Sequence, residues 1–253
     1  MKETLDTLSL GNLQLLQADK GYRYSLDPVL LARFVRVKPG ARVVDLGAGS
    51  AILSLLLARL TTANRVTGVE LQAELAERGR RNIALNQLED RVAMVTEDVR
   101  RIDTFLPAGG TDLVVANPPY RQPGTGRLAL GEERAAARHE LAGGLAAFVG
   151  AAAWAVKYGG RVAFILLAER LPALIEDLLK RQIEPKRLRM VHPRPGQPAR
   201  LVMLEGRKGG GPGLKIEPPL YLYRQEGQGR QYSEELLRMY DLDDDAEGRR
   251  PLA

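Results

Sequence analysis

Short apolar runs alternate with stretches of helical periodicity from position 42 to position 204. Parallel strands must be joined by long crossovers, which are usually helices, so this alternation predicts a mostly parallel sheet with helices on both faces. The expected strands begin at Val43 and cover 65–70, 92–95, 113–116 and 162–167. The expected helices cover 53–60, 71–83, 141–156 (ended by Gly159-Gly160) and 171–182.

Two further strands are expected at 187–191 and 200–204. The segment between them is too short for a crossover helix, so this last pair should be antiparallel. The prediction is an α/β, Rossmann-like, mostly parallel seven-stranded sheet. We expect a single domain over 1–240: an N-terminal hairpin around Gly11-Asn12 and a helix over 25–36 (together 1–40), a core over 41–206, and a C-terminal extension over 207–240. An acidic tail follows at 241–253.

A glycine-containing loop, Asp45-Leu46-Gly47-Ala48-Gly49-Ser50-Ala51, follows the first strand and opens a helix. Glycines there let the chain turn tightly and let a ligand approach the main chain, while the helix N-terminus adds positive potential. The third glycine of the dinucleotide-binding pattern is replaced by Ile52, which argues against an NAD site.

Two more acids follow the next two strands. Glu70 ends the second strand, where a carboxylate can accept hydrogen bonds from both ribose hydroxyls of a nucleoside, and Asp98 follows the third strand, where it can meet an adenine amine. The alternative for each is a solvated acid at a strand end. Together with Asp45 they describe an adenosine site without a pyrophosphate, as S-adenosylmethionine requires. The predicted cofactor contacts are Asp45, Gly47, Ala48, Gly49, Glu70, Leu71, Asp98, Val99 and Asn117.

Asn117-Pro118-Pro119-Tyr120, at the end of the fourth strand, is the predicted catalytic motif. Ligands of open parallel sheets bind beyond the carboxyl ends of the strands. The Asn117 side-chain oxygen and the Pro118 carbonyl can both accept from one planar amine, and the ring of Tyr120 can stack on an extruded base. The alternative is a chance loop.

An exocyclic amine is a poor nucleophile because its lone pair is delocalised into the ring. Two acceptors draw its hydrogens out of plane and raise electron density on nitrogen as it meets a sulfonium methyl. Catalysis would come from alignment and electrostatic stabilisation, and the sequence offers no obvious general base.

The composition excludes several kinds of site. The chain has no cysteine, and His139 and His192 match no metal spacing, so we expect no metal and no redox chemistry. The N-terminus does not look like a signal peptide and no uncharged run is long enough for a membrane span, so we expect a cytoplasmic protein with no membrane partner.

The positive charge is concentrated late in the chain. The formal net charge is +6, and positions 181–238 hold 12 Lys and Arg against 6 Asp and Glu. A basic C-terminal third suits a polyanion such as RNA, with Arg194 and Arg200 expected to contact its backbone. Ordinary surface charge is the alternative. The sequence leaves open a monomer or a homodimer.

At these motifs the chain resembles the class I methyltransferases, and within them the amino-methylating Asn-Pro-Pro-Tyr branch. It is most similar to the bacterial tRNA(valine) adenine N6-methyltransferase family, over roughly 5–239. The matching pieces are 20–27, 29–34, 45–50, 117–120, 137–140, 208–210 and 218–220. One departure is Ser50-Ala51, where a further glycine often sits.

The resemblance implies N6 methylation of an adenine in RNA, with tRNA as the RNA substrate and S-adenosylmethionine as the cofactor. It implies that the segment from Tyr22 to Asp27 covers the methionine end of the cofactor. It also implies that 121–140 borders the substrate base, with Arg138 or His139 near an RNA phosphate. Without the resemblance, His139 would be interpreted as a surface or helix-cap residue.

Four other functions stay open at this point. Enzymes that methylate a glutamine of release factors share the Asn-Pro-Pro-Tyr motif but carry a helical domain ahead of the core, and only about forty residues precede the first strand here. Guanine N2 methylation of ribosomal RNA is a second. A non-catalytic RNA-binding module on a degenerate core is a third, and an NAD-linked oxidoreductase is the fourth.

Overall fold

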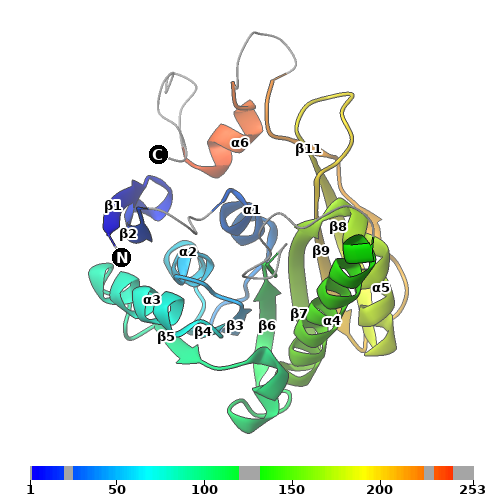
Figure 1. The fold of residues 1–253 in the computed structure, drawn as a ribbon, viewed down its shortest axis with the longest axis horizontal. Coiled ribbons are helices and arrows are strands. Elements are labelled where there is room, and N and C mark those ends of the chain that lie inside the picture. The colour runs from blue at the N-terminus through cyan, green and yellow to red at the C-terminus, as the bar shows by residue number, and fades with distance from the viewer. Residues whose placement is uncertain (1, 20–24, 120–131, 225–230, 242–253) are drawn as a thin grey trace.

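A computed structural model describes residues 2–19, 25–119, 132–224 and 231–241, with the backbone alone over 132–143. A central sheet has the order β10-β8-β9-β7-β6-β3-β4-β5, and β11 also pairs with β8 (Figure 1). Its strands are β3 (Arg42–Leu46), β4 (Arg65–Glu70), β5 (Val92–Thr96), β6 (Thr111–Ala116), β7 (Val156–Leu167), β8 (Ile183–His192), β9 (Leu201–Lys208), β10 (Lys215–Ile216) and β11 (Leu220–Tyr221).

All seven expected strands are present, and the α/β Rossmann-like prediction is confirmed. Strands β3 to β7 pair in parallel, whereas β9 runs antiparallel to both β7 and β8. The carboxyl ends of β3, β4, β5, β6, β7 and β8 therefore lie at one edge, which we call the carboxyl edge. Two short strands that the sequence did not predict, β10 and β11, extend the sheet along β8.

Helices cover both faces of the sheet (Figure 1). On one face α1 (Asp27–Phe34), α2 (Ile52–Leu60) and α3 (Ala73–Leu85) bury one apolar cluster. On the other face α4 (Glu132–Ala155) and α5 (Leu171–Lys180) bury a second, together with the 3-10 turn η2 (Val99–Thr104). Alternate residues of a strand point to opposite faces, so Val43 belongs to the first cluster and Val44 to the second.

The expected end of the 141–156 helix is right to within one residue, but its expected stop at Gly159-Gly160 was wrong. Helix α4 ends at Ala155 and β7 begins at once, with Gly159 and Gly160 inside the strand. The last helical carbonyls are satisfied by distant groups instead of a glycine cap: Gly109 donates to the Trp154 carbonyl (2.9 Å), and Lys208 donates to the carbonyl of Ala153 (2.6 Å). A register shift between β6 and β7 accommodates the glycines as a bulge.

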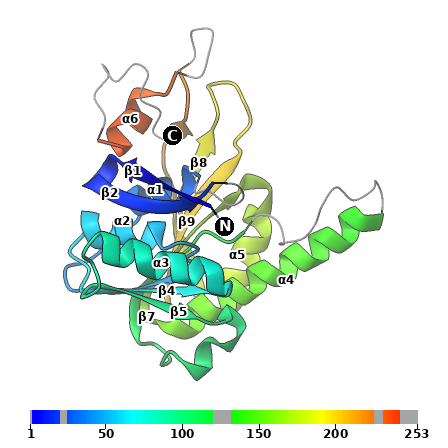
Figure 2. The ribbon, with the colours of Figure 1, turned by 60° about the vertical axis from the view of Figure 1, so that its left-hand side comes forward.

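The predicted N-terminal hairpin is present as β1 (Glu3–Leu8) and β2 (Leu13–Ala18), and it lies along α3 (Figure 2). The side chains of Asn82 in α3 and of Asn86, the C-cap residue of α3, make the hydrogen bonds that a neighbouring strand would make. Asn82 accepts from the Leu16 amide (2.7 Å) and Asn86 from the Gln14 amide (2.9 Å), and each donates back to the carbonyl of the same residue. The Asn82 amide also donates to the Ser50 carbonyl (3.0 Å), which links the hairpin to the glycine loop.

The C-terminal extension connects the far side of the sheet to α1. After β11, helix α6 (Glu234–Met239) contacts α1, and Leu236 and Tyr240 are buried in the first apolar cluster. Arg189 of β8 pairs with Glu235 at 2.6 Å. The extension therefore passes over the carboxyl edge. None of the described helices is long and apolar enough to cross a membrane.

Candidate active site

The glycine loop between β3 and α2 is held by its own backbone amides. Gly47 and Gly49 have φ of 71° and 56°, a region that glycine enters without strain. The amides of Gly47 and Ala48 donate to the Val69 carbonyl (2.8 and 3.0 Å), and the amide of Gly49 donates to Glu70 (2.9 Å). A phosphate-binding loop presents its amides to the ligand, whereas these amides are already donated to protein acceptors.

Ala51 explains the departure from the commoner glycine pattern. It is fully buried at the N-cap of α2 with φ of 69°, the left-handed conformation that glycine would adopt without cost. Its methyl group packs near Gly79, where an added Cβ would come within 3.3 Å. The loop therefore keeps the glycine-type backbone although the residue is alanine.

Glu70 binds two segments of the site with one carboxylate. It is 6% exposed. One oxygen accepts from the Gly49 amide (2.9 Å) and the other from the Gln72 amide (2.8 Å). Each carboxylate oxygen has two lone pairs, so both can still accept from a ligand hydroxyl. The same side chain therefore orients the glycine loop and offers acceptors at the end of β4.

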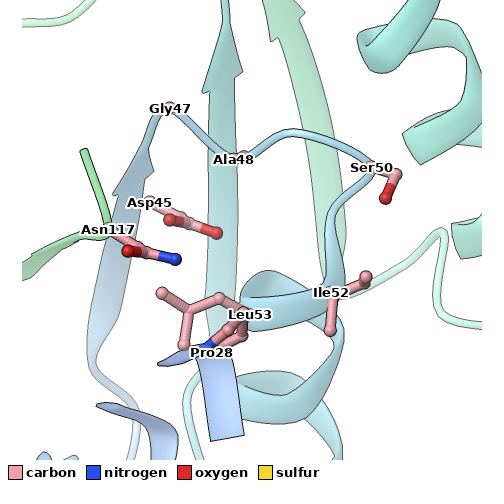
Figure 3. Close-up of a pocket in the computed structure, with 8 residues that line it drawn as sticks. All are labelled: Pro28, Asp45, Gly47, Ala48, Ser50, Ile52, Leu53 and Asn117. Atoms are coloured by element: carbon pink, nitrogen blue, oxygen red, sulfur yellow. The ribbon is translucent and has the colours of Figure 1, made fainter. Parts of the chain in front are cut away.

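A cavity at the carboxyl edge lies between the ends of β3 and β6 (Figure 3). The side chains of Asp45, at the end of β3, and Asn117, after β6, point into it. It is lined by Pro28, Asp45, Gly47, Ala48, Ser50, Ile52, Leu53 and Asn117. The structure thus brings the two predicted sites together. Sequence reasoning missed Pro28 as a lining residue, although it directly follows the predicted Asp27.

Asp45 is the titratable group of this cavity. It is 1% exposed, and the hydroxyl of Ser54, one further residue missed by sequence reasoning, donates to it at 2.8 Å. Burial raises the pKa of Asp45 to about 7, the Ser54 bond lowers it in part, and the charge of Glu70 raises it further. The sequence predicted no group near Asn117 that titrates close to neutrality, because the cause is tertiary burial.

The start of the predicted catalytic motif lies at the end of β6. Asn117 is half-buried, Pro118 is buried and Pro119 is exposed. Ala116, just before Asn117, pairs with Leu46 of β3 and Phe164 of β7, so the motif leaves the middle of the sheet. A central position gives the Asn117 backbone support on both sides. Tyr120 lies outside the described residues.

Leu71, Asp98 and Val99 follow β4 and β5 along the same edge. Leu71 is 62% exposed, which leaves an apolar side chain beside Glu70 for a ligand to cover. Asp98 accepts from the Arg100 amide (2.9 Å) and from its guanidinium (2.8 and 2.5 Å), which lowers the pKa of Asp98. Val99 packs against the second cluster. An adenine amine at Asp98 would share that carboxylate with Arg100.

The remaining predicted residues lie next to the cavity or have side chains outside the described part of the chain. Asp27 is buried in the first turn of α1, next to the cavity residue Pro28. Tyr22 lies outside the described residues. Arg138 and His139 lie on α4, but their side chains are also outside the described part.

Arg194 and Arg200 lie in the loop between β8 and β9, at the carboxyl edge but several strands from Asn117. Arg194 is half-buried and Arg200 is exposed. Four arginines of this region form ion pairs within the protein. Ion pairs join Arg181 to Asp177, Arg187 to Glu205 and Glu217, Arg189 to Glu235, and Arg238 to Glu234. Among the described residues, Arg200 takes part in none of these ion pairs.

This sheet order, with a glycine loop after β3 and an acid ending β4, defines the class I methyltransferase fold. A "predicted O-methyltransferase" of Agrobacterium tumefaciens has a similar structure, with a TM-score of 0.69 and 23% identity over 85% of this chain and 95% of that one. TrmN of Thermus thermophilus has a TM-score of 0.55 and 22% identity over 72% of this chain and 48% of that one.

The sequence comparisons point in the same direction. The family model of the TRM5/TYW2 methyltransferase domain matches residues 31–123. A tRNA1(Val) (adenine(37)-N6)-methyltransferase of Salmonella arizonae is 37% identical over 101 residues, 39% of this chain and 40% of that protein. One of Haemophilus influenzae is 31% identical over 158 residues, 61% of this chain and 66% of that protein. The chain thus spans about 40% of the length of the first curated relatives that it matches.

Replacing Asp45 with Asn should stabilise the protein in a pH-dependent way. A raised carboxyl pKa means that the folded state binds more protons than the unfolded state between about pH 4 and about pH 7, so stability falls as pH rises through that window. The Asn variant has no carboxyl group at this position, so its stability does not fall in this window for that reason. Its gain over wild type should grow from near zero at about pH 4 toward at most about 4 kcal/mol above about pH 7.

Thermal or urea unfolding of both proteins across that pH range measures the difference directly. The variant keeps an oxygen that can accept from Ser54, so the packing is matched. A difference in stability that does not change with pH would show that Asp45 titrates like an exposed carboxyl.

Proposed function

We propose that this chain transfers a methyl group from S-adenosylmethionine to the N6 amine of an adenine in tRNA. The single observation that carries the proposal is the cavity shared by Asp45, the glycine loop and Asn117. It lies between the glycine loop after β3, where we place the cofactor, and Asn117, where we place the amine. A donor methyl and an acceptor nitrogen must meet at such a junction.

The residues of the edge fit S-adenosylmethionine, whose bound form would supply an electrophilic methyl on a sulfonium. Glu70 offers carboxylate oxygens to the ribose hydroxyls, and Leu71 offers an exposed apolar surface to the adenine. Asp45, in the cavity, can balance positive charge when ionised. The glycine-loop amides are donated to Val69 and Glu70, which disfavours a pyrophosphate ligand such as NAD.

The amine would be held at Asn117 and Pro118. The Asn117 side-chain oxygen and the Pro118 carbonyl accept its two hydrogens and align its lone pair with the methyl group, so the rate gain comes from orientation and electrostatics. The target base must leave its stack to reach the cavity, which favours an unpaired nucleotide. The names of the curated relatives support adenine N6 and tRNA as the substrate.

Replacing Glu70 with Ala should weaken binding of S-adenosylhomocysteine by about 1–3 kcal/mol, the cost of a lost charge-assisted hydrogen bond. Isothermal titration calorimetry measures the change. Glu77→Ala is the matched control, because Glu77 is an exposed acid of α3 whose ion pair with Arg80 lies at the surface. NAD binding as tight as that of S-adenosylhomocysteine, or equal affinities in the two variants, would contradict the cofactor assignment.

Replacing Asn117 with Ala should lower the rate constant for methyl transfer to tRNA by about 10²–10³, as expected for losing one preorganised hydrogen bond in a transition state. Affinity for S-adenosylhomocysteine should change much less, because the lost contact serves the amine. Single-turnover transfer of labelled methyl groups measures the rate. Asn64→Ala, an exposed asparagine between α2 and β4, is the control. A variant of Asn117 with the wild-type rate would exclude this chemistry.

A further inference from the structure

A buried serine of α2 contacts the acid of the cavity. Ser54 lies in the first turn of α2 and is fully buried, and its hydroxyl donates to Oδ2 of Asp45 at 2.8 Å. A serine inside a helix often donates to a carbonyl of the preceding turn, whereas this hydroxyl donates across to strand β3. A hydroxyl without access to water needs a partner within the protein, and Asp45 is that partner.

The neighbours of the Ser54 hydroxyl fix its place. Gly68 of β4 pairs directly with Asp45 of β3. A Cβ added at Gly68 would come within 3.2 Å of the Ser54 Oγ and within 2.9 Å of the Ala48 Cβ. The glycine therefore leaves the room into which the hydroxyl fits. Strands β3 and β4 and helix α2 build this contact together.

Asp45 keeps acceptor positions for a ligand. A carboxylate has about four lone-pair positions that can accept hydrogen bonds, and the Ser54 hydroxyl uses one of them. The Asp45 side chain lines the cavity and points into it, as does that of Asn117 (Figure 3). One carboxylate therefore contacts a fixed donor of the protein and also borders a space that a ligand can enter.

The surroundings of Asp45 oppose its negative charge. Burial raises the pKa of Asp45 to about 7, and the charge of Glu70 on β4 adds to the rise. Asp27, in the first turn of α1, is another buried acid at this edge of the sheet. Helix α2 and the end of β6 present the uncharged Ser54 and Asn117. Among the described residues, Ser54 is the one whose hydrogen bond lowers this pKa.

We infer that Ser54 is a positioning residue for the cofactor: its hydroxyl holds Asp45 as a carboxylate directed at a cationic group of S-adenosylmethionine. The inference rests on the proposed function. S-adenosylmethionine carries a sulfonium and an ammonium group, and a buried carboxylate is far more stable beside a cation than alone. Near neutral pH, Asp45 would hold a proton before the cofactor binds, and the arriving cation would release that proton to solvent.

Isothermal titration calorimetry of the full chain with S-adenosylmethionine, without RNA, tests this inference across about pH 5.5–8.5. For wild type the affinity should rise by up to about tenfold per pH unit below about pH 7 and level off above it, since binding releases a proton. Ser54→Ala should bind about 3- to 30-fold more weakly at about pH 6 and within about threefold of wild type at about pH 8.5. The reason is that Asp45 without this hydrogen bond stays protonated to higher pH.

Three controls separate this effect from a change in packing. Methylthioadenosine shares the adenosine and the sulfur but carries no charge, so it should bind wild type and Ser54→Ala equally at each pH. Thr61→Val is the matched variant, because Thr61 at the other end of α2 also donates a buried hydrogen bond, to the Leu57 carbonyl (2.6 Å). In an Asp45→Asn background, Ser54→Ala should have no pH-dependent effect, because no carboxyl is left to titrate.

The outcomes are distinguishable. If wild type binds S-adenosylmethionine and Ser54→Ala loses the same factor at every pH, the positioning role is refuted while the proposed function stands. Calorimetry of wild type in two buffers of different ionisation enthalpy covers the case in which Ser54→Ala does not fold. Binding without proton release at about pH 6 would overturn the inference. Wild type that does not bind S-adenosylmethionine at any pH would remove the inference together with the proposed function.

Discussion

The hydrogen bond from the Gly49 amide to the buried carboxylate of Glu70 connects the two strands on which the candidate site depends. It ties the loop after β3 to the end of β4, and the Gln72 amide on the other carboxylate oxygen fixes the start of α3. The loop ends at Ala51, the N-cap residue of α2, in its unusual left-handed conformation, and α2 begins at Ile52. The cavity under the loop then has a defined wall opposite Asn117.

Segments from both ends of the chain are attached to this edge. The N-terminal hairpin reaches the loop through Asn82, which donates to the Ser50 carbonyl. The C-terminal extension contacts α1, and α1 contributes Pro28 to the cavity. Helix α1 therefore contacts both the cavity and the C-terminal extension.

Local sequence signals predicted the strand ends well, since Asp45, Glu70 and Asn117 each follow an apolar run that is bounded by glycine, proline or charge. Features that depend on residues distant in the sequence could not be predicted from local signals. The two-residue strands β10 and β11 are too short to show a period, and α4 ends against Gly109 and Lys208 and not at Gly159. The raised pKa of Asp45 could not be predicted without knowing that its side chain is buried. The composition of the basic C-terminal third does not show which arginines form ion pairs within the protein.

The most direct test of the central claim is the identity of the methylated nucleoside. Total RNA from a strain that lacks this protein would be incubated with the purified chain and labelled S-adenosylmethionine, digested, and separated by liquid chromatography with mass spectrometry. The account predicts labelled N6-methyladenosine in the tRNA fraction. Labelled N2-methylguanosine in ribosomal RNA, or label on a protein glutamine with RNA unlabelled, would contradict the account while leaving the fold as described.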